Sequence, residues 1–225
     1  MVLLEEKAVQ RPDDTLWSQG RLRGLALCGV LGPLQFTLAW IIVGAARPSY
    51  SPVRQYISEL AAPGGQGALV MVASFLALGL LTLAFVPALH RVLDDGVGGA
   101  IGPFLIALFG VGSIGSGIFR CDPGCGGASL SNTLHTLITY TGLGSLVGAT
   151  LVLPLRLGRA RGWAGFRAYS WLTGIVALAI FLRGFAAFGG VGLGQRLFIG
   201  ALFLWLAALA LRLFRLSGPI PTAPL

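Results

Sequence analysis

The sequence predicts an all-α integral membrane protein, a polytopic bundle of six transmembrane helices in one domain. Hydrophobic residues make up 55% of the 225 residues and charged residues only 11%, whereas about a quarter of the residues of a soluble domain are charged. A soluble fold of this length has too little interior to bury so much apolar surface. The composition therefore excludes a soluble domain, a disordered chain and a secreted disulfide scaffold.

Six apolar segments have the length that a helix needs to cross a bilayer, about 20 residues for about 30 Å of hydrocarbon. They cover residues 24–46, 66–89, 100–119, 133–155, 168–188 and 195–213. Because the segments are too long for buried strands and lack the alternation of barrel strands, we expect helices. Residues 24–215 then form one six-helix domain, between a cytoplasmic tail over residues 1–23 and a disordered tail over residues 216–225.

Basic residues indicate how these spans are oriented. Eleven of them lie in the segments on the side of the two termini and only four in the loops on the other side. Because cytoplasmic loops are enriched in Lys and Arg, both termini are expected in the cytoplasm and the protein in the cell membrane. The net charge of +8 comes from residues that flank spans rather than from a basic stripe, so no nucleic-acid partner is expected.

The first outer loop carries a helix-start signal at Ser51 and Pro52, since serine caps free amides and proline suits the first turn. One face beyond this signal is apolar and includes Val53 and Leu60, and the other carries Arg54 and Glu59. The pattern predicts a short interfacial helix on the outer leaflet.

The second outer loop contains an Asp122-Pro123-Gly124 turn between Cys121 and Cys125. Such a turn can bring two cysteines within disulfide range. A disulfide is one interpretation, and a free or redox-active pair is the other. No second pair of ligands has zinc-site spacing, so we expect no metal and no cofactor.

Two ionisable residues are expected inside the spans near their outer ends. His135 lies close to the start of the fourth span, where it either bonds to a neighbouring helix or acts as a base, proton carrier or head-group ligand. Arg183 lies in the fifth span, and an ion pair with Glu59 or Asp122 would offset the cost of burying it.

Small residues recur at helical spacing within the spans and let helix backbones approach closely. This pattern is compatible with tight packing within one chain and with a homo-oligomer. The pairs are Gly98 and Gly102, Gly112 and Ser116, Ser113 and Gly117, and Gly144 and Gly148.

Three short motifs resemble the bacterial membrane family known as domain of unknown function 998. They are residues 50–60, which read YSPVRQYISEL, residues 117–124, which read GIFRCDPG, and His135 at the start of the following span. The likeness covers residues 20–215, although members commonly have proline where this chain has Arg120. The resemblance implies a six-span membrane protein and no established activity.

Three functions follow as hypotheses. The first is an outward-facing polar vestibule that binds a lipid head group or a small amphiphile, with membrane lipids as partners. The second is a membrane-embedded hydrolase or transferase in which His135 is the base and Asp122 orients it or donates a proton. Ser58 and Ser129 are candidate nucleophiles, and no spacing selects one of them. The third is a secondary transporter. The candidate ligand-binding residues are Arg54, Glu59, Arg120, Asp122, His135, Arg183 and Arg196.

Overall fold

The structure, a computed structural model, describes residues 18–93, 97–157, 163 and 165–217. Within these residues it contains six long helices and three short 3-10 helices and no strand. The long helices are α1 (Gln19–Ala45), α2 (Ala68–Leu93), α3 (Val97–Ile118), α4 (Leu130–Leu157), α5 (Phe166–Arg183) and α6 (Val191–Leu216). The short ones are η1 (Ile57–Ala61), η2 (Pro123–Cys125) and η3 (Phe185–Phe188). All six long helices are apolar and long enough to cross a membrane, which confirms the predicted fold class.

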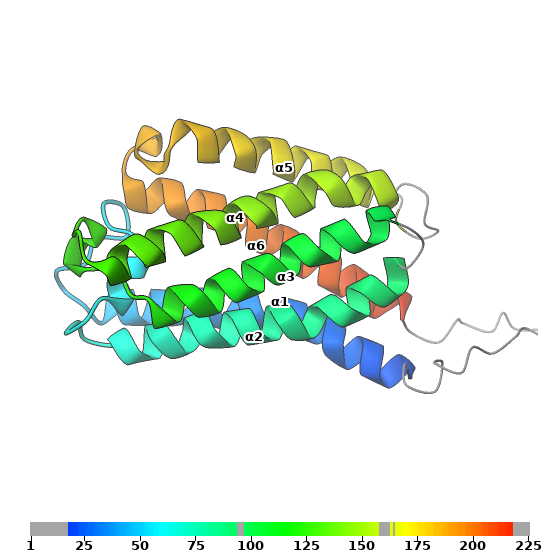
Figure 1. Cartoon of the computed structure of the whole chain (residues 1–225), viewed down its shortest axis with the longest axis horizontal. Helices are drawn as coiled ribbons and strands as arrows, with labels where there is room; N and C mark the ends of the chain where they lie inside the picture. The colour runs from blue at the N-terminus through cyan, green and yellow to red at the C-terminus, as the bar shows by residue number, and fades with distance from the viewer. Residues whose placement is uncertain (1–17, 94–96, 158–162, 164, 218–225) are drawn as a thin grey trace, which may run out of the picture.

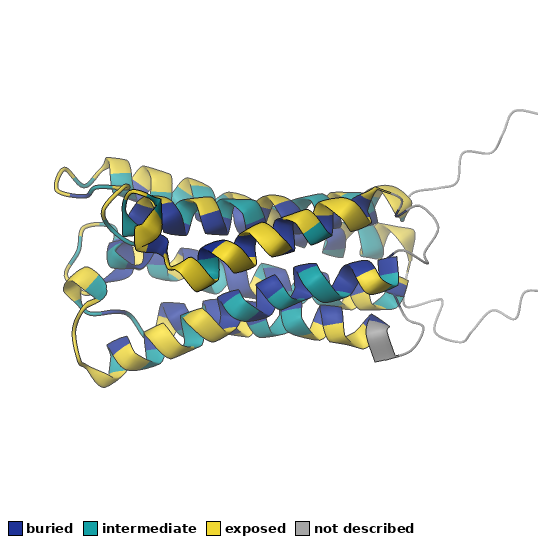
Figure 2. Cartoon of the chain, turned by 90° about the horizontal axis from the view of Figure 1, so that it is seen from above, coloured by how far each residue is buried: buried dark blue, intermediate teal, exposed yellow. Residues whose placement is uncertain are grey.

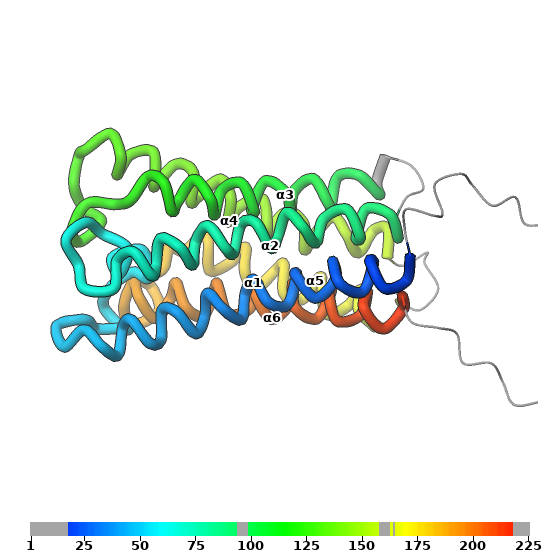
Figure 3. Tube along the Cα trace, turned by 90° about the horizontal axis from the view of Figure 1, so that it is seen from below, coloured from blue at the N-terminus to red at the C-terminus, as the bar shows by residue number. Residues whose placement is uncertain are grey.

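The helices run lengthwise in an elongated bundle (Figure 1). Each helix packs against the next one along the chain, and α6 packs back against α1, which closes the ring. Three connections, containing η1, η2 and η3, gather at one end, which we call the loop end; α1 begins and α6 ends at the opposite, terminal end (Figures 1 and 3). Buried residues face the bundle interior and exposed residues face outward (Figure 2).

Helix boundaries differ from the expected spans for local reasons. The α1 helix begins at Gln19 rather than at residue 24, because the Ser18 hydroxyl caps it by accepting from the Arg21 N–H at 3.3 Å. At the other end of the chain, α6 continues to Leu216. The expected tails fall mostly on residues 1–17 and 218–225, which lie outside the described residues.

The fifth helix ends five residues before the predicted end of its span. Gly184 has a φ of +77°, a conformation that glycine adopts without strain and that terminates helices. Arg183 is therefore the last residue of α5 and is exposed. Arg183 thus lies at the very end of the span and not inside it as expected, and a cation at this position interacts favourably with the helix dipole.

The predicted helix of the first outer loop is also corrected. Ser51 starts only a single turn, in which its carbonyl accepts from the Gln55 N–H at 2.9 Å. The helical segment begins at Ile57, and Ile57 and Leu60 are buried against the bundle. Most of η1 is therefore buried against the bundle.

Glycines place α2, α3 and α4 in close contact. A Cβ atom on Gly79 of α2 would lie 2.4 Å from the Gly110 carbonyl oxygen of α3, and one on Gly112 would lie 3.0 Å from the Gly142 Cα of α4. Backbones this close exclude any larger residue. Of the small residues that the sequence singles out on α3, Gly102, Gly112 and Gly117 therefore pack against other helices of the same chain.

Replacing Gly79 with Ala is expected to destabilise the protein by about 1–3 kcal/mol, because the new methyl group overpacks a contact with rigid backbone. Thermal unfolding of purified protein in mild detergent measures the effect. Gly200→Ala is the matched control, since a Cβ there meets nothing within 4 Å, and its unfolding midpoint should be unchanged or higher. Equal midpoints for the two variants would contradict the packing described for α2 and α3.

Candidate functional site

A polar cavity of about 110 Å³ lies at the loop end of the bundle. We call it the outer cavity. Its walls come from the first outer loop, η2, α4, η3 and the start of α6. The lining residues are Tyr56, Ser58, Cys125, His135, Thr136, Thr139, Tyr140, Leu143, Phe185 and Gln195.

A smaller cavity of about 40 Å³ lies deeper in the bundle, and we call it the inner cavity. It shares Ser58, Thr139, Leu143 and Gln195 with the outer cavity. Its remaining walls are mostly apolar and include four phenylalanines that meet edge to face, namely Phe36, Phe75, Phe109 and Phe203. The two cavities therefore adjoin, and we call them together the cleft. The polarity of its lining falls from the loop end toward the centre of the bundle.

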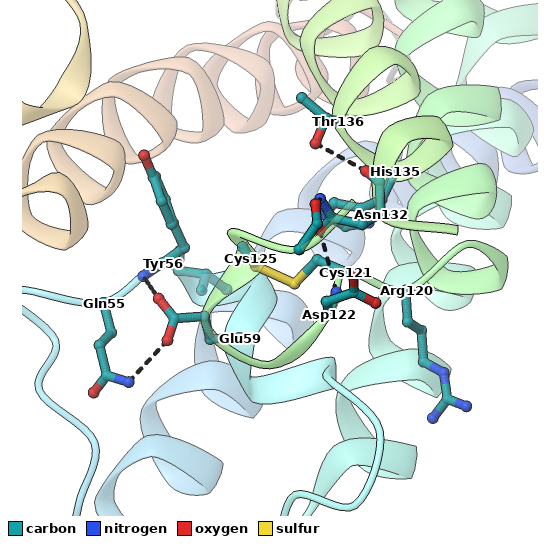
Figure 4. Close-up of a disulfide and its surroundings, with 12 residues drawn as sticks. Gln55, Tyr56, Glu59, Arg120, Cys121, Asp122, Cys125, Asn132, His135 and Thr136 are labelled. Atoms are coloured by element: carbon teal, nitrogen blue, oxygen red, sulfur yellow. Dashed lines mark hydrogen bonds between the residues drawn. A yellow bond between two sulfur atoms is a disulfide. The ribbon is translucent and has the colours of Figure 1, made fainter. Parts of the chain in front are cut away.

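Glu59 determines the local shape of the first outer loop. One carboxylate oxygen accepts from the Tyr56 N–H at 2.9 Å, and the other accepts from the Gln55 side-chain amide at 2.8 Å (Figure 4). This capping arrangement starts η1 at Ile57. As a result Ser58, which is only 6% exposed, faces the cleft.

Two arginines hold this loop on the bundle. Arg196 donates to the carbonyl oxygens of Gln55 at 3.0 Å and Gly192 at 2.9 Å, and it also donates to the Tyr50 hydroxyl. Arg47 donates to the carbonyl oxygens of Glu59 and Leu60, each at 3.1 Å. Loop carbonyls that lack water need such donors. Arg196 therefore satisfies backbone groups, and it is not part of the lining of either cavity.

The second outer loop is closed by a disulfide between Cys121 and Cys125, whose Cα atoms are 5.0 Å apart. Gly124 takes the positive φ, +76°, that the turn between them requires. The Asp122 carboxylate accepts from the N–H of Ser129 at 3.2 Å and from its hydroxyl at 2.7 Å. Asn132 accepts from the Asp122 N–H at 3.2 Å (Figure 4). Asp122 thus holds the loop against the start of α4.

His135 lies in the wall of the outer cavity and is 4% exposed. Its Nδ1 atom is 2.7 Å from the Phe119 carbonyl oxygen and 3.2 Å from that of Ser116. Because carbonyl oxygens only accept, Nδ1 carries the proton, and Nε2 of the neutral ring carries the lone pair. Among the described residues the ring has no hydrogen bond to Asp122, so a backbone carbonyl orients it instead of the expected carboxylate.

Gln195 and Thr139 are site residues outside the set of candidate ligand-binding residues, although the spacing of Thr139 and His135 predicts that both face the bundle interior. The Gln195 side-chain oxygen accepts from the Ile57 N–H at 2.7 Å, and Gln195 is 5% exposed. The Thr139 hydroxyl is 2.8 Å from the Ser116 hydroxyl. Both are polar residues within long apolar segments, and this was the signal available to find them.

Most of the candidate ligand-binding residues do not converge on the cleft. Of the seven, only His135 lines it. Arg54 and Arg183 are exposed, and Arg120 points away from the disulfide (Figure 4). Within the described part of the chain no ion pair joins Arg183 to Glu59 or Asp122, and both carboxylates accept from other donors. No three His, Cys, Asp or Glu side chains among those residues gather in a way that could hold a metal ion.

The fold and the apolar surface of its helices define a multi-pass membrane protein with a cleft at one end of a six-helix ring. A family model described as "Protein of unknown function (DUF998)" matches residues 30–212. The chain belongs to this family, as the motifs in its outer loops indicate. No curated protein and no solved structure matches the chain.

Replacing Arg196 with Ala is expected to lower stability by about 2 kcal/mol or more, because buried loop carbonyls lose their donor. Thermal unfolding and hydrogen exchange of residues 50–57 measure the effect. Arg54→Ala, which removes an exposed arginine of the same loop, is the control and should behave like the wild type. If both variants unfold alike, Arg196 does not hold the loop.

Labelling of the two cysteines in the second outer loop tests the orientation of the chain in the membrane. The basic residues predict that the loop end faces outward. An impermeant thiol reagent should then label Cys121 and Cys125 in intact cells only after reduction, because the disulfide protects them. A Cys28→Ala background removes the remaining cysteine, which is free in the structure. Labelling solely in inside-out vesicles would place the loop end in the cytoplasm.

Proposed function

We propose that the outer cavity binds the polar end of a lipid or small amphiphile from the surrounding membrane. The observation that carries this proposal is the cleft itself. It combines buried polar side chains at the outer cavity with an apolar continuation in the inner cavity. This polarity gradient matches a molecule with one polar end and one apolar end.

The position of the cavity mouth supports access from the bilayer. Thr136 and Tyr140 line the cavity and are also exposed on the outward side of α4. Phe185 of η3 forms the facing wall. The mouth therefore lies on the flank of the bundle, beside α4, where a lipid can present its head group while its chains stay in the membrane.

The alternative functions have less support. A hydrolase that uses His135 and Asp122 needs the carboxylate near the imidazole, whereas Asp122 bonds to Ser129. A transporter usually carries ionisable residues at the membrane midplane. The charged residues of the described spans lie instead toward the helix ends, as Arg156, Arg183 and Arg212 illustrate.

Replacing Thr139 with Met should fill the region where the two cavities meet and reduce lipid labelling at least tenfold. The measurement uses a photoreactive lipid in nanodiscs, followed by mass spectrometry of the labelled peptides from η1 and α4. Thr133→Met, on the exposed side of α4, adds the same side chain outside the cleft and should label like the wild type. Unchanged labelling of a normally folded Thr139→Met variant would argue against the cleft as a binding site.

A further inference from the structure

We infer that the head group held in the outer cavity is an uncharged hydroxyl-bearing group, of the kind that a diacylglycerol presents, and not a phosphate or a carboxylate. This inference rests on the proposed function and names the chemistry that the same cleft would select. Three properties of the lining lead to it: its charge, its free hydrogen-bonding groups and its size.

The charge of the lining excludes an anionic head group. The lining contains no arginine or lysine, and a buried anion without a cationic partner is costly. The nearest candidate cations of the loop end are engaged elsewhere or directed outward, since Arg196 and Arg47 donate to loop carbonyls and Arg183 is exposed. Burial raises the pKa of Tyr56, and Tyr140 and Glu59 raise it further, so its phenol stays neutral.

The lining has both a donor and acceptors without a partner, so a matching ligand must both donate and accept hydrogen bonds. Because Nδ1 of His135 donates to the Phe119 carbonyl, Nε2 is left as an acceptor. Because the side-chain oxygen of Gln195 accepts from Ile57, its NH₂ group is left as a donor. Within the described residues neither of these two groups, nor the Ser58 hydroxyl, has a hydrogen-bond partner, although all three residues are more than nine-tenths buried.

A hydroxyl group matches these free donor and acceptor groups, because it can donate to His135 and accept from Gln195 or Ser58 at the same time. A phosphate diester or a carboxylate accepts only and would leave the His135 lone pair unmatched. A phosphate monoester such as phosphatidic acid can keep one P–OH donor, but it brings a negative charge into a lining without arginine or lysine. An ester or ketone oxygen also accepts only and would leave the same lone pair of His135 without a donor. A buried group left unpaired costs about 1–3 kcal/mol, which is enough to discriminate between these ligand classes.

The size of the cleft limits how much of a lipid can enter. The outer and inner cavities measure about 110 and 40 Å³, and an apolar cavity of about 150 Å³ accommodates a benzene molecule. The cleft therefore has room for a hydroxyl group and the few carbons next to it. The acyl chains would remain outside the mouth, along α4.

Two photoreactive lipids with identical chains, a diacylglycerol and a phosphatidic acid, test the inference in phosphatidylcholine nanodiscs that contain the full-length protein. The diacylglycerol should label the peptides of η1 and α4 at least tenfold more than the phosphatidic acid. Gln195→Glu should lower the diacylglycerol labelling at least tenfold, because it keeps the oxygen that accepts from Ile57 and replaces the NH₂ donor with an oxygen.

Matched variants separate hydrogen bonding from folding. Gln66→Glu makes the same change at an exposed residue of the loop end and should label like the wild type. Ser58→Ala removes one small hydroxyl and should lower labelling about threefold, which keeps the test informative if Gln195→Glu fails to fold. His135→Asn retains a donor for the Phe119 carbonyl, removes the ring Nε2 and should lower labelling about tenfold.

The outcomes distinguish this inference from the proposed function. Equal or stronger labelling by the phosphatidic acid overturns the neutral head group while leaving a lipid-binding cleft. Wild-type labelling by diacylglycerol in folded Gln195→Glu and Ser58→Ala variants overturns it as well. If neither lipid labels the wild type above the level of Thr139→Met, the cleft binds no lipid and both proposals fail.

Discussion

The architecture of the loop end depends on the two arginines that satisfy the carbonyl groups of the first outer loop. Irregular backbone next to a bilayer is tolerated only where its polar groups find partners within the protein. Arg196, from the start of α6, and Arg47, just after α1, supply these partners from two helices that neighbour each other in the ring. Their bonds hold the loop with its short 3-10 helix η1 against the bundle, and this placement creates the wall that carries Ser58.

The same constraint explains why the cleft has free polar groups and no charge. The cationic side chains of the loop end serve the backbone or face outward, and the Asp122 and Glu59 carboxylates cap and close their own loops. The groups left for a ligand are neutral. In His135 and in Gln195 one polar atom of the side chain forms a structural hydrogen bond, and the other remains available. Structural hydrogen bonds therefore select the atoms that remain available, and through them the chemistry that the cleft can recognise.

Charge alone was a poor guide to the site. Ionisable residues near a membrane interior usually have a role, and for this reason the sequence indicates arginines and carboxylates as candidates. Arg183 was placed within a span because the apolar run continues past it, yet Gly184 ends the helix there. Gln195 carries no charge and is the first residue of the predicted sixth span, yet its side chain forms both a loop contact and a cavity wall.

The sequence by itself determined the six membrane helices and the family, because apolar length and short loop motifs are local properties of the chain. It also indicated the turn between Cys121 and Cys125, whose chemistry is contained in five consecutive residues. Only the tertiary structure decided which polar groups meet. The bonds from Gln195 to Ile57 and from Arg196 to Gln55 join residues about 140 positions apart. Such pairs depend on how six helices close into a ring, and no local pattern encodes that closure.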